Sequence, residues 1–551
     1  MRFSFRGNSQ DQSGGRCALS LLGCLLIAAA AFLPLVSQAA RSHEQPAEPH
    51  NSPLWANLAP GKYHVGFKYI YTFDRSRTWT ITRGYDQPFS PDLQGRPIRI
   101  SVWYPASGGR RMTYNDYVHG GAPPLFKTYD AIVRAQDLLH SRLNVPKGSL
   151  PQFLATPVNA YSSAAPLNQR FPLVLYCDGL DGDTVSNFVL EEYLASNGFV
   201  VATMPTIGPS SGSPTQNRTQ PDLEATIRDM EFVWSVLRAS PDVAPEELAV
   251  MGHSVGAIEA VLFAMRNGDV SAVVGLDGTY GFQGATNVLT GFYDYNPLHM
   301  GSALLDLRRA QTNVGPSAFV PDLSAVNALH YSPRTLVTLK GMYHTDFTTF
   351  GILAKEFNFP PFADRNYNVG SAGYQSVCRI VRDFLQSVLI GDSGMASRLS
   401  ADVASAPGGS LNRVASIPLP PSPQQLVAIA SDRGLDAAEE IIQQYKRDAP
   451  DNVIVSESDY NSLGYSLLAQ KSFDKAILAL LLDCYVYPGS ANLADSLGDM
   501  YVGAGQTAKA REAYRHALDL LPNDSEQNVA GKEDLKQTIS QSIKGLGPDG
   551  I

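Results

Sequence analysis

A G-x-S-x-G motif at residues 252–256 is the pattern in this sequence with the clearest chemical meaning. It follows an apolar run, Leu248–Met251, and precedes a helix-forming stretch, Ala257–Arg266. A serine on such a strand-to-helix turn adopts a strained backbone conformation, which the two glycines permit because they avoid side-chain clashes. The turn projects the hydroxyl into a cleft at the end of the sheet, beside the N–H groups of the helix N-terminus. Ser254 is therefore the candidate nucleophile.

A histidine must lie close to Ser254 in the fold, because a serine hydroxyl is a poor nucleophile until an imidazole takes its proton. Of the ten histidines, His299, His330 and His344 lie downstream of the motif. His344 comes shortly after the apolar run Thr335–Leu339, which predicts a strand that leads into a loop. We therefore expect His344 to be the general base and interpret the other two as surface histidines.

The imidazole in turn needs a carboxylate to fix its tautomer and to stabilise its charged form. Asp277 directly follows the predicted strand Ala272–Leu276 and is the leading candidate. Asp306, inside the next apolar run, and the more distant Asp322 are the alternatives. With Asp277 as the acid, the chain order is serine, acid, histidine, which is the order of the α/β-hydrolase fold.

A glycine-rich loop, Asp178–Gly182, follows the predicted early strand Pro172–Tyr176. Its glycines allow a backbone N–H to point into the cleft, where it can stabilise a developing negative charge. The alternative interpretation is an ordinary strand-to-helix turn.

Short apolar runs alternate with helix-length amphipathic stretches from about residue 61 to residue 391. This alternation is typical of α/β units on a largely parallel sheet. The clearest predicted strands are Ile98–Trp103, Pro172–Tyr176, Val200–Met204, Leu248–Met251, Ala272–Leu276 and Thr335–Leu339. Helices are predicted over Phe188–Ser196, Asp222–Ala239 and Tyr374–Ile390. Because most of the strands are continuously apolar, we expect an α/β-hydrolase sheet with helices on both faces.

The C-terminal part repeats with a period of 34 residues. Leu463-Gly464 recurs as Leu497-Gly498, Lys475-Ala476 as Lys509-Ala510, and Pro488 as Pro522. This is the tetratricopeptide spacing, in which a small residue lets two antiparallel helices touch and a proline ends the second helix. Asp483 departs from the motif, because the second repeat has the small residue Ala517 at the matching position. We predict an all-α tetratricopeptide-like repeat domain over residues 423–546, with a degenerate helix pair at 423–450 and a capping helix at 534–544.

The N-terminus has the features of a secretory signal. Three arginines precede an apolar run, Ala18–Val36, which ends on the small-residue pattern Ser37-Gln38-Ala39-Ala40. The alternative is a retained membrane anchor, because about 20 apolar residues can span a bilayer. The expected organisation is a signal peptide at 1–40, a polar tether at 41–60, a catalytic domain at 61–395, a Pro/Gly/Ser-rich linker at 396–422, and the repeats. Once the signal peptide is cleaved, we expect a secreted or periplasmic protein with no stable membrane span.

Composition and charge exclude several classes of protein. The 551 residues are 44% hydrophobic and 17% charged, which is typical of a globular protein of two or three domains. The formal net charge is −9, and residues 1–40 contribute +2, so the processed chain carries −11. Such a chain is not expected to bind nucleic acid. The five cysteines lack the paired spacing of a zinc site or a disulfide scaffold, so we expect no metal and no cofactor.

The 23-residue spacing from Ser254 to Asp277, the K-G-x-x-H segment ending at His344, and the segment Arg96–Ala106 resemble the platelet-activating factor acetylhydrolase group of serine esterases. The resemblance covers most of residues 61–391. It implies an α/β-hydrolase that cleaves short or oxidised acyl chains from phospholipid-like esters without a metal. It also favours Asp277 over Asp306.

The same resemblance implies that the oxyanion is bound by the backbone N–H groups of Val255 and Leu180. Two positions depart from the family pattern: Asp178 stands where the family usually has histidine, and Ala257 where it often has glycine. A carboxylate at position 178 brings negative charge near the developing oxyanion. The familiar acetylhydrolases also lack a tetratricopeptide tail.

The leading hypothesis is a secreted serine carboxylester hydrolase with the triad Ser254, His344 and Asp277, acting on a small ester or lipid. A second hypothesis is an inactive hydrolase-fold protein whose helical repeats dock a protein partner. A third keeps the fold but changes the substrate, as in a dienelactone-hydrolase-like or polyester-cleaving enzyme.

Overall fold

The computed structural model describes residues 51–80, 94–180, 182–311, 319–361, 365–450, 452–525 and 528–547. The predicted signal peptide and the first part of the predicted tether lie outside these ranges. Within them, we find no helix whose length and apolar character would let it span a bilayer.

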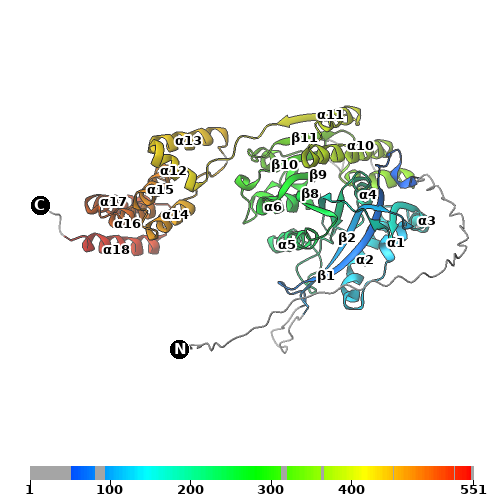
Figure 1. Ribbon diagram of the computed structural model, residues 1–551, viewed down its shortest axis with the longest axis horizontal. Coiled ribbons are helices and arrows are strands. Elements are labelled where there is room, and N and C mark those ends of the chain that lie inside the picture. The colour runs from blue at the N-terminus through cyan, green and yellow to red at the C-terminus, as the bar shows by residue number, and fades with distance from the viewer. Residues whose placement is uncertain are drawn as a thin grey trace, which may run out of the picture. The chain divides into compact units, whose positions relative to one another are not determined.

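A sheet of twelve strands forms the centre of the region that ends at Val414 (Figure 1). Its six adjacent parallel strands, in spatial order, are β11 (Arg334–Leu339), β10 (Ala303–Arg309), β9 (Val270–Leu276), β8 (Val243–His253), β6 (Phe171–Cys177) and β7 (Val200–Thr203). Next to β7 lies the antiparallel strand β2 (Arg96–Ser107). All six predicted strands are present, and the strand order with its helical crossovers confirms the α/β-hydrolase fold class.

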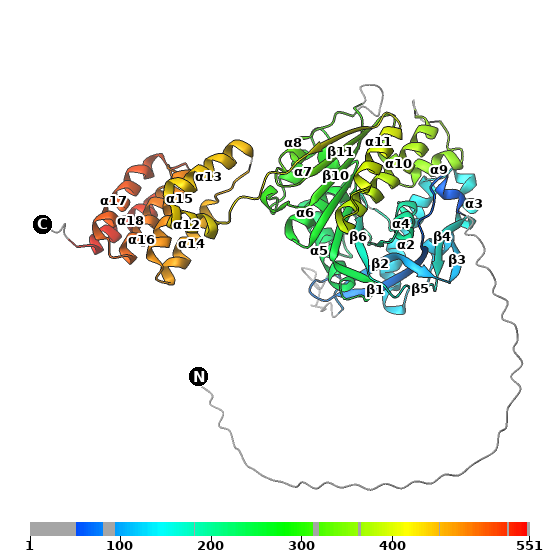
Figure 2. The same ribbon diagram turned by 45° about the horizontal axis from the view of Figure 1, so that its top comes forward.

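Helices cover both faces of this sheet (Figure 2). The side chains of β6 alternate, so that Val174 and Tyr176 pack on one face, and Leu173 and Leu175 on the other. The first face is covered by α4 (Phe188–Ser196) and α10 (Tyr367–Leu385), and the second by α5 (Gln220–Leu237) and α6 (Gly256–Arg266). These helices agree with the predicted ones to within about two residues, with one exception. Helix α10 begins seven residues before the predicted start at Tyr374, and the last five residues of Tyr374–Ile390 form a π-helical turn.

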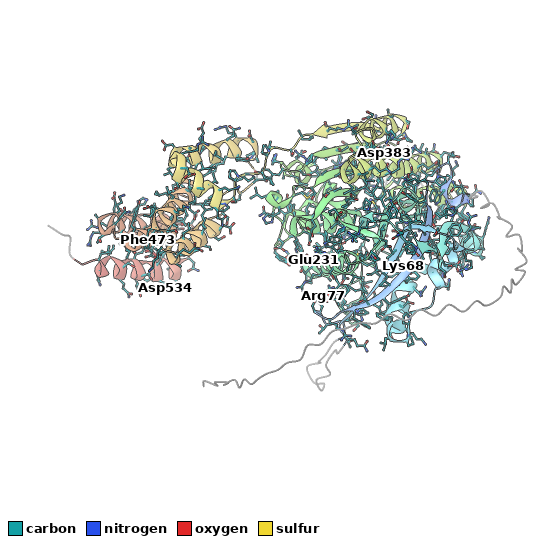
Figure 3. All side chains as sticks on the ribbon, viewed as in Figure 1. Lys68, Arg77, Glu231, Asp383, Phe473 and Asp534 are labelled. Atoms are coloured by element: carbon teal, nitrogen blue, oxygen red, sulfur yellow. The ribbon has the colours of Figure 1, made fainter. Side chains whose placement is uncertain are left out.

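Four strands on the β2 side of the sheet were not predicted. They are β1 (His64–Asp74), β3 (Arg110–Thr113), β4 (Pro157–Ser162) and β5 (Ala165–Pro166). Figure 3 labels Lys68, inside β1, and Arg77, just beyond its end; their charged groups pair with Asp242 at 3.8 Å and with Asp229 at 2.6 Å. Charged side chains and half-buried positions hide the strand pattern in β1, although its whole length pairs with β2.

Shorter elements complete this region. Between β3 and β4 lie α1 (Tyr114–His119), α2 (Lys127–Leu143) and α3 (Leu150–Ala155). Further along the chain are α7 (Thr286–Thr290), α8 (Ser324–Asn327) and α9 (Phe350–Glu356). Single 3-10 turns include η4 (Thr279–Gly281) and η6 (His344–Phe347).

The prediction of a tether over residues 41–60 is wrong for its second half. Trp55 is fully buried, its indole N–H donates to Glu192 at 2.7 Å, and its ring contacts the ring of Tyr193 edge-on. Leu54 and Leu58 are buried in the same core. The Pro-rich composition hid these three apolar anchors.

The prediction of a linker over residues 396–422 is also wrong for most of its length. Residues Met395–Ser405 form α11, and Ser410–Val414 form β12, which pairs antiparallel with β11. The sheet therefore extends beyond the predicted domain end at residue 395. Because β12 is an edge strand with exposed residues, its sequence carries no apolar signal.

From Pro423 onward, every secondary-structure element of the described residues is a helix. Three helix pairs and a last helix follow one another: α12 (Pro423–Arg433) with α13 (Leu435–Asp448), α14 (Glu457–Ala469) with α15 (Phe473–Val486), α16 (Ala491–Gly503) with α17 (Thr507–Leu520), and α18 (Val529–Gly545). A Cβ atom on Gly464 would lie 2.0 Å from the Leu480 side chain, and one on Gly498 would lie 2.3 Å from the Tyr514 ring. The two glycines thus allow the close helix contacts that the 34-residue repeat predicts.

Asp483 on α15 is fully buried, and neither carboxylate oxygen has a well-placed hydrogen-bond donor among the described residues. Burial raises its pKa to about 8, and the negative charges of Glu457 and Asp459 act in the same direction. An acid whose pKa is higher in the folded than in the unfolded state loses stabilising free energy as the pH rises between the two values.

We expect Asp483→Ala, which copies the second repeat, to stabilise the helical region at pH 8 by about 1–3 kcal/mol, because it removes a buried group that lacks donors. The gain should shrink toward pH 5, where Asp483 is protonated in the folded protein. Denaturant unfolding followed by circular dichroism at both pH values measures the difference. Asp519→Ala, at an exposed position on α17, is the matched control. Equal stabilisation at both pH values would contradict the assignment.

Candidate active site

Ser254 lies on the sharp turn between β8 and α6, with a left-handed φ of 57°. The turn needs both flanking glycines. A Cβ atom on Gly252 would lie 2.1 Å from the carbonyl carbon of Gly256, and one on Gly256 would lie 2.2 Å from the carbonyl oxygen of Cys177. Real Cβ atoms do not approach so closely, so the backbone geometry that presents Ser254 depends on the motif.

His344 and Asp277 form the strongest side-chain contact of the site. The Nδ1 atom of His344 lies 2.6 Å from Oδ2 of Asp277, although the two residues are 67 positions apart. Asp277 is 1% exposed, and it also has a left-handed φ, of 45°, immediately after β9. The carboxylate can only accept, so Nδ1 of His344 carries the proton and Nε2 is left to accept one.

Arg309, at the end of β10, holds the other side of this carboxylate. Its backbone N–H donates to Oδ1 of Asp277 at 3.2 Å, and its Nε lies 3.1 Å from Oδ2. Its guanidinium also lies over the rings of Phe282 and Phe319.

The electrostatic environment favours a charged Asp277 and a neutral His344. Burial by itself would raise the pKa of Asp277, but the bond from His344 and the positive charge of Arg309 outweigh it and lower the pKa. Burial lowers the pKa of His344, and the charges of His253 and Arg309 lower it further against the opposing effect of Asp277. A base with a lowered pKa stays unprotonated at lower pH.

The structure does not bring the alternative acids to His344. Asp306 is buried with Arg308 and accepts a hydrogen bond from the hydroxyl of Tyr280 at 3.0 Å. Asp322 accepts hydrogen bonds from Ser324 and Thr286.

Among the described residues, the Ser254 hydroxyl has its hydrogen bond with Thr279 Oγ1, at 3.3 Å, rather than with His344. The backbone N–H of Thr279 also donates to the carbonyl oxygen of Ser254, at 2.9 Å. A loose nucleophile–base arrangement of this kind is common before a substrate binds.

The two predicted oxyanion donors are Val255 and Leu180. In the described part of the chain, neither backbone N–H has a hydrogen-bond acceptor. The loop that carries Leu180 approaches the nucleophile, because a Cβ atom on Gly179 would lie 3.1 Å from Cβ of Ser254. Among the residues that the structure describes, these two N–H groups therefore have no acceptor, as an oxyanion site requires.

Polar side chains fix the ends of this loop. The hydroxyl of Thr206 donates to the carbonyl oxygen of Gly179 at 2.8 Å, and the N–H of Gly182 donates back to Thr206 at 2.7 Å. Arg99, fully buried, donates to the hydroxyl of Thr184 at 2.6 Å.

Asp178, the departure from the family pattern, accepts from the N–H of Gly179 at 2.8 Å, from the hydroxyl of Tyr176 at 3.1 Å, and from the hydroxyl of Ser186. Burial would raise its pKa, but hydrogen bonding and the positive charge of His253 outweigh burial and lower it. The carboxylate is therefore held by its own donors at the start of the loop.

Sequence reasoning missed Thr279, Arg309 and His253. His253 directly precedes Ser254 and Thr279 lies two residues after Asp277, but neither carries a motif of its own. Arg309 follows the apolar run that contains Asp306, and its sequence position gave no indication of its contact with Asp277. Among the described residues there is no group of three or more His, Cys, Asp or Glu side chains that could hold a metal ion.

We expect the rate at which a fluorophosphonate probe labels Ser254 to rise with pH with a midpoint below about 6.5, the ordinary pKa of histidine, because the environment of His344 lowers its pKa. Arg309→Met removes a positive charge beside Asp277, so this midpoint should move to higher pH. Labelling rates measured from pH 4.5 to 8.5 test this, with Arg228→Met, at an exposed arginine, as control. An unchanged midpoint in Arg309→Met would show that Arg309 does not act on His344.

No protein-family model matches the chain, and no curated protein matches it. Among solved structures, a ferulic acid esterase from Streptomyces cinnamoneus is similar at 19% sequence identity and a TM-score of 0.45. The match covers 64% of this chain and 98% of that one. At this level of similarity, the neighbour's substrate does not carry over to this chain.

Proposed function

We propose that this protein is a secreted or periplasmic serine carboxylester hydrolase. The observation that carries the proposal is the 2.6 Å bond between His344 and Asp277, next to a serine on a left-handed strand-to-helix turn. The two free N–H groups beside Ser254 support the same reaction class.

Acylation begins when the Ser254 oxygen attacks the ester carbonyl carbon and Nε2 of His344 takes the hydroxyl proton. The carbonyl oxygen becomes an oxyanion, which the N–H groups of Val255 and Leu180 bind. Asp277 stays ionised and stabilises the imidazolium. The tetrahedral intermediate then expels the alcohol, which leaves with the proton from His344, and the acyl group stays on Ser254.

Deacylation repeats these steps with water. His344 removes a proton from the water as its oxygen attacks the acyl carbon. The second oxyanion is bound at the same two N–H groups, and Ser254 leaves with the proton from His344. The products are one alcohol and one carboxylic acid, and no metal or cofactor takes part in the sequence.

The substrate class we propose is short-acyl or phospholipid-like esters, on the basis of the sequence resemblance. The ring of Phe282 lies 5.3 Å from the ring of His344, which gives the site an apolar wall. The net charge of −11 after processing makes simple electrostatic attraction to anionic lipid surfaces an unfavourable route to the substrate. We also propose that the C-terminal helical repeats dock a protein partner.

The first test is covalent labelling. We expect the mature protein to react with a fluorophosphonate probe and to hydrolyse p-nitrophenyl acetate, and Ser254→Ala to lose both activities, with kcat/KM reduced at least about 10⁴-fold. Ser405→Ala, on α11, is the control and should behave as wild type. An unlabelled wild-type protein without esterase activity would falsify the proposed function.

The second test is the dependence on acyl length. We expect kcat/KM for p-nitrophenyl esters to be highest for acetate to butyrate and to fall at least about tenfold by palmitate, as short-acyl specificity implies. A flat profile or a long-chain optimum would contradict the proposed substrate class and leave the serine mechanism intact.

A further inference from the structure

His253 connects three parts of the site. It is the last residue of β8, directly before Ser254, and is 7% exposed. Its Nε2 atom lies 3.1 Å from the backbone carbonyl oxygen of His344, and its Nδ1 atom lies 3.5 Å from Oδ1 of Asp178. Its ring also stacks on the ring of His344, with a centroid distance of 4.6 Å and an angle of 28°.

The hydrogen-bond partners define what each atom of His253 does. A carbonyl oxygen only accepts, so Nε2 of His253 carries a proton and donates it to His344. Nδ1 faces Asp178, whose carboxylate already accepts from Gly179, Tyr176 and Ser186. A proton on Nδ1 makes the 3.5 Å contact an ion pair.

We propose that His253, held by Asp178, is a positioning residue for the proposed reaction: it fixes the main chain of His344 and ties it to the loop that carries Leu180. The inference rests on the proposed function, because it assigns His253 the role of keeping His344, the proposed base, in a fixed position relative to the loop of Leu180, a proposed oxyanion donor.

The position of His253 in the sheet gives this connection its physical basis. Asp178 follows β6 and His344 follows β11, and β8 lies between these strands in the sheet. The carboxyl ends of these three strands lie at the same edge of the sheet, but His344 and Asp178 lie on separate loops. A displacement of about 1 Å between base and nucleophile costs about 100-fold in rate, so a link that spans the two loops preserves reactivity.

His253 also acts on the basicity of the imidazole it stacks against, because a positive charge on it disfavours a second charge on His344. Other groups contribute to the same balance. The charged or titratable groups around His344 are Asp277 and Arg309 from the ends of β9 and β10, His253 and Asp178 from the ends of β8 and β6, and the Asp346–Arg365 ion pair beside η6.

Two substitutions separate the contributions of His253. His253→Gln keeps an N–H that can reach the carbonyl of His344, but it removes the ring and its charge. His253→Phe keeps a stacked ring, but it removes the N–H. We expect His253→Phe to lower kcat for p-nitrophenyl acetate about 10- to 100-fold with KM changed less than about twofold, and His253→Gln to recover most of that loss.

The pH profile provides a readout that a purely structural role would not change. In His253→Gln the acid limb of kcat/KM should move to higher pH, because the positive charge next to His344 is gone. Titration of the His344 ring by NMR, assigned with His344→Gln, should show the same shift without substrate. His516→Gln, at an exposed position on α17, is the control and should leave both profiles unchanged.

A double-variant cycle tests the part assigned to Asp178. If Asp178 acts through His253, the combined loss of kcat in Asp178→Asn with His253→Phe is smaller than the product of the single losses. Independent, multiplicative losses overturn that part of the proposal. A kcat within twofold of wild type in His253→Phe, or an unshifted His344 titration in His253→Gln, overturns the role of His253.

Failure of the proposed esterase function can be distinguished from failure of the role of His253. If wild type neither hydrolyses esters nor reacts with the fluorophosphonate probe, the proposed function fails, whereas the NMR titration still reports on the contact between His253 and His344. If His253→Phe does not fold, the pH profile of His253→Gln and its cycle with Asp178→Asn decide the outcome by the same criteria.

Discussion

The buried carboxylate of Asp277 is the group on which the geometry of the site depends. A carboxylate at 1% exposure is costly unless donors replace the water it has lost. Two donors contact it, Nδ1 of His344 and the backbone N–H of Arg309, and the Arg309 guanidinium adds a positive charge beside it. Because Asp277 is ionised, it fixes the tautomer of His344. The nitrogen that faces away from Asp277 is then the one available to take a proton from Ser254.

These residues meet because adjacent parallel strands end at the same edge of the sheet. The register pairs Cys177 with Gly252, His253 with Leu276, and Leu276 with Leu307. The residues that follow these positions in the chain therefore come together, although they are far apart in sequence. The site therefore needs no long insertion between strands. Short loops suffice, and their backbone conformations are fixed locally by glycines and by left-handed residues such as Ser254.

The parts of the protein that the sequence alone predicts are those encoded by local patterns. The continuously apolar strands β6 and β9 and the G-x-S-x-G turn are of this kind, and so is the choice of His344 after an apolar run. The strand β1 and the edge strand β12 were missed because half-exposed strands carry mixed side chains. Trp55 was missed because its partners, Glu192 and Tyr193, lie more than 130 positions away.

The polar residues of the site also fall into those with a local sequence signal and those whose role depends on tertiary contacts. Asp277 was the leading candidate because it directly follows a predicted strand, and the family resemblance favoured it further over Asp306, which lies inside an apolar run. They differ in their tertiary contacts: Asp306 forms an ion pair with Arg308 and accepts a hydrogen bond from Tyr280, whereas Asp277 faces His344. Arg309 has no local signal, since its contact with Asp277 depends on the pairing of β9 with β10.

The contrast between Asp178 and Glu191 shows how hydrogen-bond donors control the charge of buried carboxylates in this part of the fold. Both are buried, but Asp178 has three donors, whereas neither oxygen of Glu191 has a hydrogen-bond partner among the described residues. The pKa of Asp178 is accordingly lowered, against the effect of burial. The pKa of Glu191 is raised, mainly by burial. Asp178 therefore retains its charge, and its carboxylate accepts hydrogen bonds from the N–H of Gly179 and from the side-chain hydroxyls of Tyr176 and Ser186. The next N–H along the loop, that of Leu180, has no acceptor among the described residues, so an aspartate where the resembled esterases usually have histidine is compatible with the proposed reaction.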